Sequence, residues 1–451
     1  MPDFAGMTLE ELIREGGYAC SCGRHHEAEI KYLKIERNAV RHIPEGLAAI
    51  GVKRPFIVCD ANTRAAAWDK VRAQLDAAGI PYVFYCFPHA HLEPDEYAVG
   101  ALCMAYDPAC DGVIGIGSGV INDCCKVLAH AVRRPQMIVG TAPSMDGYAS
   151  ASSSMLENRV KITTINACPA AIICDTEIMK EAPDRLLWAG LGDMLAKYSA
   201  LCEWRIARMV NEEYYCEAVA ELMRKSLRKI VESAPRLMER DPDVIGAITE
   251  GLVLSGIAMA FAGVSRPASG LEHYFSHMWE MFSLDRGTPT QLHGIQVGVG
   301  MHLVFGIYER LRHITPDRET ALRAMREFDP AAWEARVRRV FGNAAETLIR
   351  SEYERWHKND PQRHAERLER ILANWEGIIR AIDEELPPAK EIDALMKLQG
   401  MPVYPSDLGE SDQNAYDAFI CSRDSRDKYL LSSFLWDLGL LEDFPLALSE
   451  A

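Results

Sequence analysis

Three histidines within the segment SGLEHYFSHMWEMFSLDRGTPTQLHGIQVGVG (269–300) have the residue type and spacing best suited to metal chemistry. His273 and His277 are four residues apart, so on a helix both imidazoles would project from one face. His293 follows a polar, proline-broken loop and opens a second apolar segment. Neutral imidazole binds Zn, Ni, Cu or Fe, so three histidines from two helix ends form a candidate metal pocket. The HxxxH spacing lacks the adjacent Glu of metalloproteases.

A carboxylate lies inside another apolar segment, LGDMLAK (191–197). On a core-facing helix Asp193 needs a partner, because burying its charge alone costs several kcal/mol. Lys197, one helical turn later, is one candidate partner. A metal shared with the histidines is the other.

A glycine turn, GIGSGVINDCCK (115–126), follows a predicted strand and opens a predicted helix. Such glycines let the backbone approach a pyrophosphate, whose oxygens bind the N–H groups at the helix start. The spacing is not GxGxxG, because Asn122 stands where the third glycine would fall. A plain structural turn therefore remains an alternative.

Two further loops follow predicted strands. Asp60 ends the run PFIVCD, where a carboxylate can bind a ribose 2′-OH and repel a 2′-phosphate, favouring NAD over NADP. A helix N-cap is the simpler role for this residue. The loop TAPSMDGYAS (141–150) is rich in small hydroxyl residues and contains Asp146; by composition alone it would be a turn.

The elements that must position these residues change character near residue 180. Before it, predicted strands alternate with helices, which indicates parallel βαβ units in an open sheet with helices on both faces. After it, helical periodicity continues to the end of the chain. We therefore predict a lead-in (1–52), an α/β Rossmann-like dinucleotide-binding domain (53–180) and an all-α domain with a C-terminal extension (181–451). The predicted strands are 55–60, 81–87, 111–119 (which runs into the glycine turn), 136–144 and 170–178, and the first predicted helices of the second part are 184–206, 211–235, 241–263, 268–283 and 291–313.

Composition limits the class of protein. The chain has 451 residues, of which 48% are hydrophobic and 25% charged, as in soluble globular proteins. A formal net charge of −16 argues against nucleic acid or an anionic membrane as partner. The acidic start lacks the apolar core of a signal peptide, and the apolar run 251–264 is too short to span a bilayer. We therefore expect a buried core helix there, and reduced thiols for the 13 cysteines in a cytoplasmic protein.

The lead-in contains CSCGRHH, with Cys20, Cys22, His25 and His26. These are the ligand types of half a zinc site. A second close Cys/His pair is not obvious downstream. A structural turn carrying reduced thiols is therefore the favoured interpretation, and metal binding the alternative.

Five motifs in this order, GIGSGVINDCCK, TAPSMDGYAS, GLGDMLAK, SGLEHYFSH and LHGIQVGVG, resemble the sn-glycerol-1-phosphate dehydrogenase family. This family is a branch of the metal-dependent, iron-containing-type alcohol dehydrogenases, which include glycerol dehydrogenase and lie near dehydroquinate synthase. The resemblance covers residues 50–310 and looks closest to the longer bacterial branch. It implies a Rossmann-like domain followed by a helical domain.

The resemblance also implies roles at the matching positions. Asp193, His273 and His293 would hold one divalent metal, Zn, Ni or Fe, and Asp146 and His277, with Asp193, would face the substrate. The GSG turn departs from the family's usual run of glycines, and CSCGRHH and the tail have no role in the family pattern. The residues expected to contact the dinucleotide are Asp60, Gly117, Gly119, Val120, Ile121, Asn122, Asp123, Thr141, Ala142, Pro143, Ser144 and Ser150.

The expected function is NAD- or NADP-dependent interconversion of dihydroxyacetone phosphate and sn-glycerol 1-phosphate by metal-assisted hydride transfer. Arg266, Arg159 and Lys161 are candidates for the substrate phosphate by residue type alone. We expect a cytoplasmic homo-oligomer, a dimer or larger, that binds neither nucleic acid nor membrane. A polyol dehydrogenase without a phosphate pocket is the first alternative; a dehydroquinate synthase-type lyase and a nucleotide-binding regulatory protein are less favoured.

Overall fold

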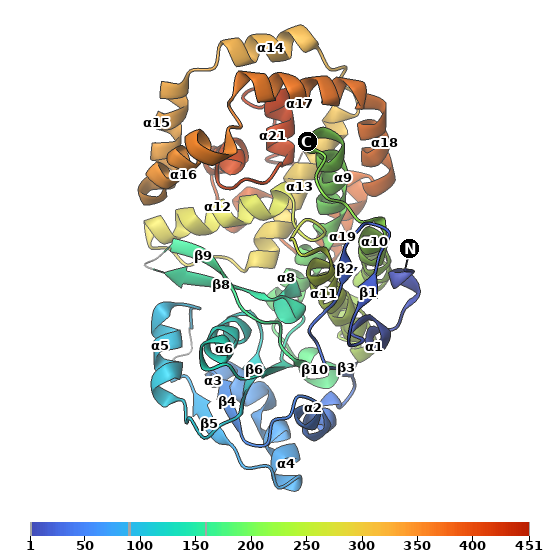
Figure 1. Ribbon diagram of the computed structural model, residues 1–451, viewed down its shortest axis with the longest axis vertical. Coiled ribbons are helices and arrows are strands. Elements are labelled where there is room, and N and C mark those ends of the chain that lie inside the picture. Colours follow the sequence, from blue (N-terminus) through green and yellow to red (C-terminus); the bar gives the residue numbers. More distant parts are fainter. Residues whose placement is uncertain (1, 89–91, 158–159, 451) are drawn as a thin grey trace. The chain divides into compact units, whose positions relative to one another are not determined.

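The computed structural model describes residues 2–88, 92–157 and 160–450 and contains two compact units (Figure 1). The first, here called the sheet unit, comprises Met1–Leu195, Cys216–Ala268 and Leu292–Ile295. The second, the helical unit, comprises Ala196–Tyr215, Ser269–Gln291 and Gln296–Ala451. The chain therefore passes between the units several times.

The sheet unit is built on a six-stranded parallel sheet with the strand order β3-β10-β7-β6-β4-β5. Its four inner strands are buried along their whole length, as their continuous apolar sequences require in a sheet covered on both faces. The strands are β3 (Tyr32–Glu36), β4 (Pro55–Cys59), β5 (Val83–Cys86), β6 (Gly112–Gly117), β7 (Gln136–Gly140) and β10 (Ala171–Asp175).

Helices cover both faces of this sheet. On one face the core includes side chains of α2 (Ile43–Ala49) and α4 (Asp69–Ala77). On the other it includes side chains of α5 (Glu96–Ala105) and α6 (Gly119–Val132). The α/β class with a parallel sheet is thus confirmed, and the helices fix the loops at the carboxyl edge.

The strand order reverses between β4 and β6, since β5 lies on one side of β4 and β6 on the other. Ligands of open α/β sheets bind outside the carboxyl ends of the strands at such a reversal. Asp60 follows β4 and the GSG turn follows β6. Topology therefore brings together two of the loops that the sequence singled out.

Further helices complete the sheet unit. Helix α11 packs against α10, α8, β3 and the short helix η4. It is long and apolar enough to cross a membrane, but most of it is buried, which confirms the core helix predicted at 251–264. The bounds are η4 (Asp146–Ala149), α7 (Thr176–Met179), α8 (Asp184–Leu195), α10 (Glu217–Ser233) and α11 (Pro242–Ala262).

The helical unit contains no strand among its described residues, as predicted for this part of the chain. Its helices are α9 (Lys197–Asn211), α12 (Leu271–Arg286), α13 (His293–Leu311, whose first turn belongs to the sheet unit), α14 (Arg318–Arg326), α15 (Pro330–Phe341), α16 (Ala345–Ser351), η7 (Glu352–Trp356), α17 (Pro361–Ala373), α18 (Trp375–Glu385), α19 (Ala389–Leu398), α20 (Asp412–Cys421) and α21 (Leu431–Asp437).

Three features differ from the sequence prediction. Edge strand β3 lies within the predicted lead-in, and the antiparallel pair β8 (Ser152–Glu157) and β9 (Val160–Ile165) was not predicted. These strands are short and rich in Ser, Thr, Lys and Glu, so they lack the apolar run of the inner strands. The helix predicted at 184–206 is divided into α8 and α9 at Ala196.

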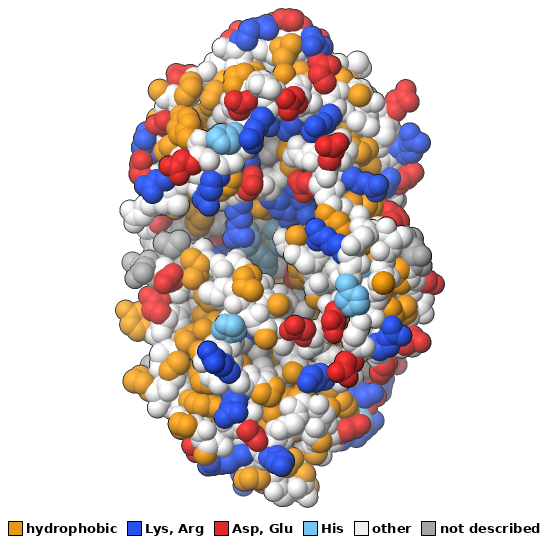
Figure 2. Space-filling view, viewed as in Figure 1, with side chains coloured by type: hydrophobic (Ala, Val, Ile, Leu, Met, Phe, Trp, Pro, Cys, Tyr) orange, Lys and Arg blue, Asp and Glu red, His pale blue; other side chains and the backbone are white. Residues whose placement is uncertain are grey.

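The surface carries charges of both signs. On the face shown in Figure 2, Lys and Arg side chains are interspersed with Asp and Glu. Neither sign of charge covers this face uniformly.

Candidate functional site

The GSG turn connects β6 to α6 at the carboxyl edge of the sheet. A Cβ on Gly117 would lie 2.5 Å from Cβ of Ile121, so only glycine fits there. At Gly119 the nearest atom to such a Cβ is Cγ of Met145 at 3.7 Å, which leaves room above the first turn of α6. Ser118, the N-cap, does not cap the helix with its hydroxyl, which instead bonds that of Ser144. The turn thus meets the requirements of an oxyanion cradle.

The TAPS loop lies beside this turn. Gly117 and Gly140 are paired across β6 and β7, and the backbone N–H of Thr141 donates to the carbonyl of Gly117 over 3.1 Å. The buried Tyr148 hydroxyl donates to the carbonyl of Ala142 (2.6 Å). Thr141, Ala142, Pro143 and Ser144 are buried but follow the strand end directly. Two of the three segments predicted to bind the cofactor are therefore hydrogen-bonded to each other where strands β6 and β7 end.

The side chains of two predicted cofactor residues have hydrogen-bond partners within the protein. The Asn122 amide is fully buried and donates to the carbonyl of Gly147 (3.1 Å), while Gln136 donates to its oxygen (3.1 Å). The Asp123 carboxylate accepts the backbone N–H of Ser154 (3.2 Å). Burial raises the pKa of Asp123 above its usual value, although Lys126 opposes this. Ile121 is a core residue at 1% exposure, whereas Val120 and Ser150 are half-buried.

Asp60 is the N-cap of the helix that follows β4. Its Oδ1 accepts the backbone N–H of Thr63 over 2.8 Å, and the Thr63 hydroxyl accepts the N–H of Asp60 over 3.0 Å. Asp60 therefore caps a helix and also lies at the strand reversal.

The two carboxylates predicted at the reaction centre are linked within the sheet unit. Asp193, 1% exposed on α8, accepts the backbone N–H of Asp146 at Oδ2 over 3.0 Å. Asp146 in turn accepts the hydroxyl of Ser255, on α11, at Oδ2 over 2.8 Å. Loop 141–150 is therefore held to both α8 and α11 at the residue expected to face the substrate.

Close backbone contacts position α8. A Cβ on Gly190 would lie 1.8 Å from the carbonyl oxygen of Pro143, and one on Gly294 would lie 1.9 Å from that of Ala189. Both contacts lie within the sheet unit. Through them the helix that carries Asp193 packs directly on the TAPS loop and on the first turn of α13, which begins at His293.

His273 lies on α12 in the helical unit, next to a buried carboxylate. Its Nδ1 is 3.0 Å from Oε1 of Glu272. The same oxygen accepts the backbone N–H of Gly270, and Oε2 of Glu272 accepts the Ser199 hydroxyl over 2.7 Å. Burial alone would raise the pKa of Glu272, but the hydrogen bonds from His273 and its other donors lower it. A carboxylate on Nδ1 orients a metal-binding imidazole to ligate through Nε2.

His277 is half-buried one turn later on α12. Its Nδ1 lies 3.8 Å from Oε2 of Glu280, and its ring contacts that of Tyr274 edge-on. Of the phosphate candidates, Arg266 is buried and Lys161 is half-buried, and Arg159 lies outside the described residues.

Several supporting residues were missed by the sequence analysis. Lys126 is 1% exposed and donates from Nζ to the carbonyls of Gly147 (2.7 Å) and Ser152 (3.0 Å). Glu272 and Ser255 orient His273 and Asp146. Glu272 and Lys126 could have been found from the sequence only because they lie within the motifs. Nothing in the sequence marks Ser255.

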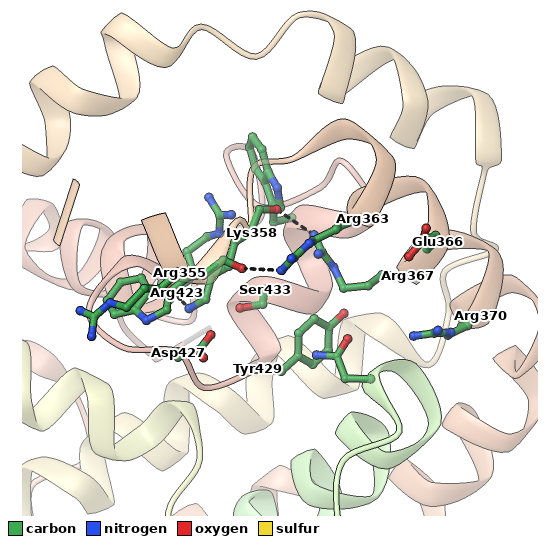
Figure 3. A pocket seen from close by; sticks show the side chains of 13 residues that line it. Arg355, Lys358, Arg363, Glu366, Arg367, Arg370, Arg423, Asp427, Tyr429 and Ser433 are labelled. Carbon is green, nitrogen blue, oxygen red and sulfur yellow. Dashed lines mark hydrogen bonds between the residues drawn. The ribbon is translucent and has the colours of Figure 1, made fainter. Parts of the chain in front are cut away.

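A separate cavity of about 320 Å³ lies in the helical unit (Figure 3). It is formed by η7, α17, α21 and the segments near them, and none of the predicted site residues lines it. Its basic side chains are Arg355, Lys358, Arg363, Arg367, Arg370 and Arg423.

The chain is similar in sequence to known proteins. Residues 34–183 match the family model described as iron-containing alcohol dehydrogenase. A glycerol-1-phosphate dehydrogenase (NAD(P)+) of Halalkalibacterium halodurans is 35% identical over 295 residues, 64% of this chain and 74% of that protein. One of Methanosarcina acetivorans is 34% identical over 262 residues, 57% and 71% of the two chains.

Solved structures share the fold. Glycerol dehydrogenase from Schizosaccharomyces pombe has a TM-score of 0.59 at 14% identity, covering 93% of this chain and 91% of that one. A 1,3-propanediol oxidoreductase has a TM-score of 0.60 at 14% identity, covering 92% and 99%. At this identity the likeness concerns the fold alone.

Proposed function

Because the chain belongs to the glycerol-1-phosphate dehydrogenase family, we propose that it interconverts dihydroxyacetone phosphate and sn-glycerol 1-phosphate with a nicotinamide cofactor. The observation that carries this proposal is the 35% identity to a dehydrogenase of that name over 74% of its length. The arrangement of the two loops at the strand reversal and the orientation of His273 by Glu272 support it.

The dinucleotide would bind at the carboxyl edge of the sheet. Gly117 and Gly119 would allow its pyrophosphate to approach the start of α6, with Val120, Ile121, Asn122 and Asp123 contributing backbone groups. Thr141, Ala142, Pro143, Ser144 and Ser150 would line the other side. Asp60 at the end of β4 favours NAD, because its carboxylate repels a 2′-phosphate.

One divalent metal would be held by Asp193, His273 and His293. A carboxylate and two imidazoles suit Zn, Ni or Fe, and the Glu272 carboxylate on Nδ1 of His273 is the support such a ligand needs. When bound, the metal would polarise the substrate carbonyl and the nicotinamide would be the hydride donor. The remaining tasks of the reaction would be performed by the protein's own side chains.

Those side chains must bind the substrate, orient it and transfer a proton. Asp146, fixed by Ser255, would orient the substrate hydroxyls. His277 would exchange a proton with the substrate oxygen, directly or through water. Lys161 and Arg266 remain the candidates for the phosphate group. The enzyme would be a cytoplasmic homo-oligomer, which size-exclusion chromatography with light scattering would test.

The first experiment measures NADH oxidation with dihydroxyacetone phosphate and with unphosphorylated dihydroxyacetone. We expect turnover of the phosphorylated ketone to exceed that of the other by at least about tenfold, because a phosphate contact contributes a charge-assisted hydrogen bond. Equal turnover would make the chain a polyol dehydrogenase. His293→Ala should lose both the catalytic metal and turnover, while His313→Ala, at an exposed position, should retain both. Full activity of His293→Ala without that metal would refute the ligand assignment.

A further inference from the structure

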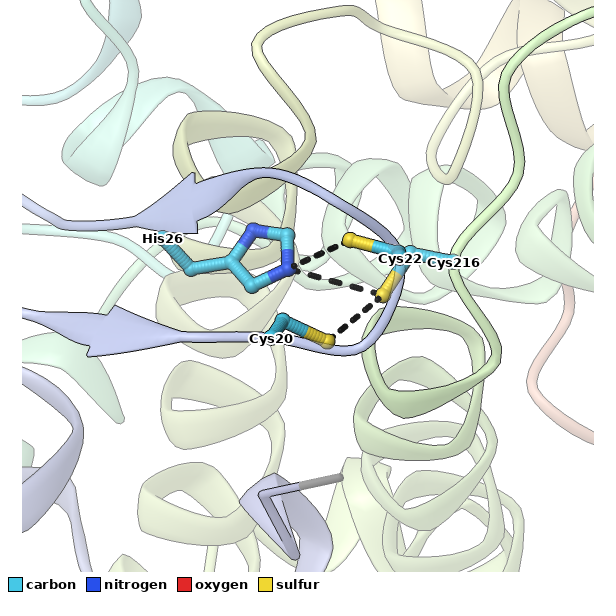
Figure 4. A group of neighbouring side chains, drawn as sticks. All are labelled: Cys20, Cys22, His26 and Cys216. Carbon is cyan, nitrogen blue, oxygen red and sulfur yellow. Dashed lines mark hydrogen bonds between the residues drawn. The ribbon is translucent and has the colours of Figure 1, made fainter.

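Three cysteines and a histidine that the proposed function does not use lie together in the sheet unit (Figure 4). Cys20 and Cys22 lie in the loop between the short strands β1 (Tyr18–Ala19) and β2 (His25–His26). Cys216 immediately precedes α10. The Sγ atoms of the three cysteines and a ring nitrogen of His26 all lie within 4.8 Å of one another.

The separations are those of ligands around one tetrahedral ion. Zn–S bonds of about 2.3 Å at the tetrahedral angle place two sulfurs about 3.8 Å apart, and a sulfur and a nitrogen about 3.6 Å apart. Here Sγ of Cys20 is 3.8 Å from Sγ of Cys216. Nε2 of His26 is 3.5 Å from Sγ of Cys216 and 3.3 Å from Sγ of Cys22.

The imidazole is oriented for ligation. His26 is fully buried, and its Nδ1 lies 2.6 Å from the carbonyl oxygen of Phe261 on α11. A backbone carbonyl on Nδ1 selects the tautomer whose Nε2 can ligate a metal. Strand alternation turns His25 to the exposed side of the hairpin, so of the two histidines in CSCGRHH only His26 lies in this cluster.

The fourth group, Cys216, is 1% exposed and is the N-cap residue of α10. Burial, together with the nearby Cys22 and Cys20, raises the pKa of the Cys216 thiol to about 12, although the backbone N–H of Val219 opposes the shift. Three thiols this close together can ionise together only if a cation balances their charge. A coordinated thiol is deprotonated by the metal itself.

We propose that Cys20, Cys22, His26 and Cys216 form a structural zinc site. Three thiolates and one imidazole fill all four positions of a tetrahedral ion, which is the composition of closed structural sites and leaves no position for substrate. Soft sulfur ligands exclude Mg and Ca. The site is independent of the proposed catalytic function, because none of its ligands is among the catalytic candidates.

The site would fasten the N-terminal hairpin to α10 and α11. This hairpin has only two residue pairs in its ladder. It also packs against neighbouring elements: the Phe4 ring contacts that of His26 edge-on and that of Phe261 at a tilt, and Arg24 donates to the carbonyl of Ala262 (2.8 Å). A two-stranded hairpin of this size is not stable on its own. The metal would close a chain segment of some 190 residues between His26 and Cys216.

The test is metal analysis of the full chain purified under reducing conditions without chelator. We expect about one equivalent of zinc that His293→Ala retains and Cys216→Ser loses. Cys103→Ser, at an exposed cysteine of the same unit, is the matched control and should retain it. Cys22→His keeps a zinc ligand type and should keep the metal. Cobalt substitution should give thiolate charge-transfer absorption that Cys216→Ser removes and His293→Ala does not.

If Cys216→Ser does not fold, wild-type protein alone tests whether the site binds zinc. A mercurial reagent that displaces metal from thiolates should release the zinc, which a chromogenic chelator then reports. Absence of zinc from a well-folded chain would overturn the proposal. So would a mass two hydrogens lower that shows a Cys20–Cys216 disulfide in place of metal.

A second, independent observation concerns the arginine-lined cavity of the helical unit. Arg367 is paired with Asp437 (2.7 Å), and Arg370 and Arg423 lie 3.7 and 3.6 Å from carboxylates. Among the described residues, Arg355, Lys358 and Arg363 form no ion pair, and they donate only to neutral groups. Arg355 donates to the hydroxyl of Ser351, Lys358 to the carbonyls of residues 423 and 426, and Arg363 to the carbonyl of residue 356. The lining also includes the carboxylates of Glu366 and Asp427, so its six basic side chains outnumber its acidic ones.

Two buried polar atoms of the lining lack a hydrogen-bond partner within the described ranges: Oγ of Ser433, whose side chain is 4% exposed, and Nε of Arg423, 3% exposed. Burial and the charge of Arg423 lower the pKa of Lys358 to about 8. Buried donors without acceptors cost free energy unless a ligand satisfies them.

We infer that this cavity binds a small dianion, phosphate or a phosphate monoester. Several guanidinium groups and a hydroxyl are the donors that recognise such a group. Titration calorimetry with inorganic phosphate and with phenyl phosphate should show binding that Ser433→Ala and Arg363→Gln weaken at least about tenfold. Arg350→Gln, an exposed residue of the same unit, should not change it.

Tighter binding of phenyl phosphate would identify a monoester as the natural ligand, and equal binding would identify free phosphate. Each experiment is run with His293→Ala as well, so that binding at the catalytic site is recognised by its loss. No binding, or binding that neither cavity variant weakens, would overturn the inference.

Discussion

Glu272 lies outside the proposed ligand set but would orient one of its members, His273. Its carboxylate is fully buried and is satisfied by Ser199, the backbone of Gly270 and Nδ1 of His273. A buried carboxylate in this network fixes the ring of His273 and increases the basicity of its other nitrogen. The same principle applies at His26, where a carbonyl takes the place of the carboxylate.

Glu272→Gln should therefore weaken retention of the catalytic metal about 10- to 100-fold, since an amide neither carries the charge nor polarises the ring as strongly. Equilibrium dialysis against a competing chelator, followed by metal analysis, measures this. Asp285→Asn, at the exposed end of the same helix, is the control and should leave retention unchanged. An unaltered metal affinity in Glu272→Gln would show that His273 is not a ligand.

Residue types were predictable from the sequence, but their partners were not. Asp193, His273 and His293 were found as ligand types within motifs. Cys216 could not be connected with CSCGRHH, because the two are separated by some 190 residues and only the fold brings them together. For the same reason the buried hydrogen bonds of the Asn122 and Asp123 side chains, which follow the GSG turn, could not be predicted.

At the scale of elements, α8 is held by two glycine contacts. Gly190 lies against Pro143, and Gly294, directly after His293, lies against Ala189. Each contact is backbone to backbone, so neither side can yield by rotating a side chain.

Gly294→Ala should displace the first turn of α13 from α8, because the new Cβ would lie 1.9 Å from a carbonyl oxygen. We expect a loss of about 1–3 kcal/mol in the free energy of unfolding and weaker binding of the catalytic metal. Urea denaturation and metal analysis measure the two effects.

Gly246→Ala on α11 is the matched control for that change. Its Cβ would meet Cγ2 of Thr176 at 3.4 Å, an ordinary contact, so the substitution should be neutral or stabilise the helix by about 0.5–1 kcal/mol. Equal stability of Gly294→Ala and wild type would show that the contact between α8 and α13 can relax.

Elements with strong apolar patterns were predicted correctly, as β4, β6, β7 and β10 show. Strands β3, β8 and β9 were not, because an edge strand and a two-stranded ribbon need no continuous apolar run. The break between α8 and α9 was also not predicted, because position 196 is an alanine, with no proline or glycine there to mark a helix end. Local sequence thus determined the inner layers, and tertiary packing determined the edges.

At the scale of the whole molecule, stability depends on several ionisable groups buried in the helical unit. Arg367 and Asp437 form a buried pair that joins α17 to α21, and the Tyr429 hydroxyl donates to the same carboxylate (2.8 Å). His364, on α17, is 1% exposed beside them. Burial lowers the pKa of His364 below the ordinary imidazole value of 6.5, although Asp437 opposes the shift.

This shift predicts how the free energy of unfolding depends on pH. As pH falls below 6.5, the unfolded chain takes up a proton at His364 while the folded chain resists it, so the unfolded state binds more protons. The stability contribution is therefore complete above pH 6.5 and is lost as pH falls toward the lowered folded pKa. Urea unfolding at pH 5.5 and 7.5 should show a smaller loss on acidification for His364→Gln than for wild type. His313→Gln, at an exposed site, should lose as much as wild type, and identical pH dependence of all three would contradict the role of His364.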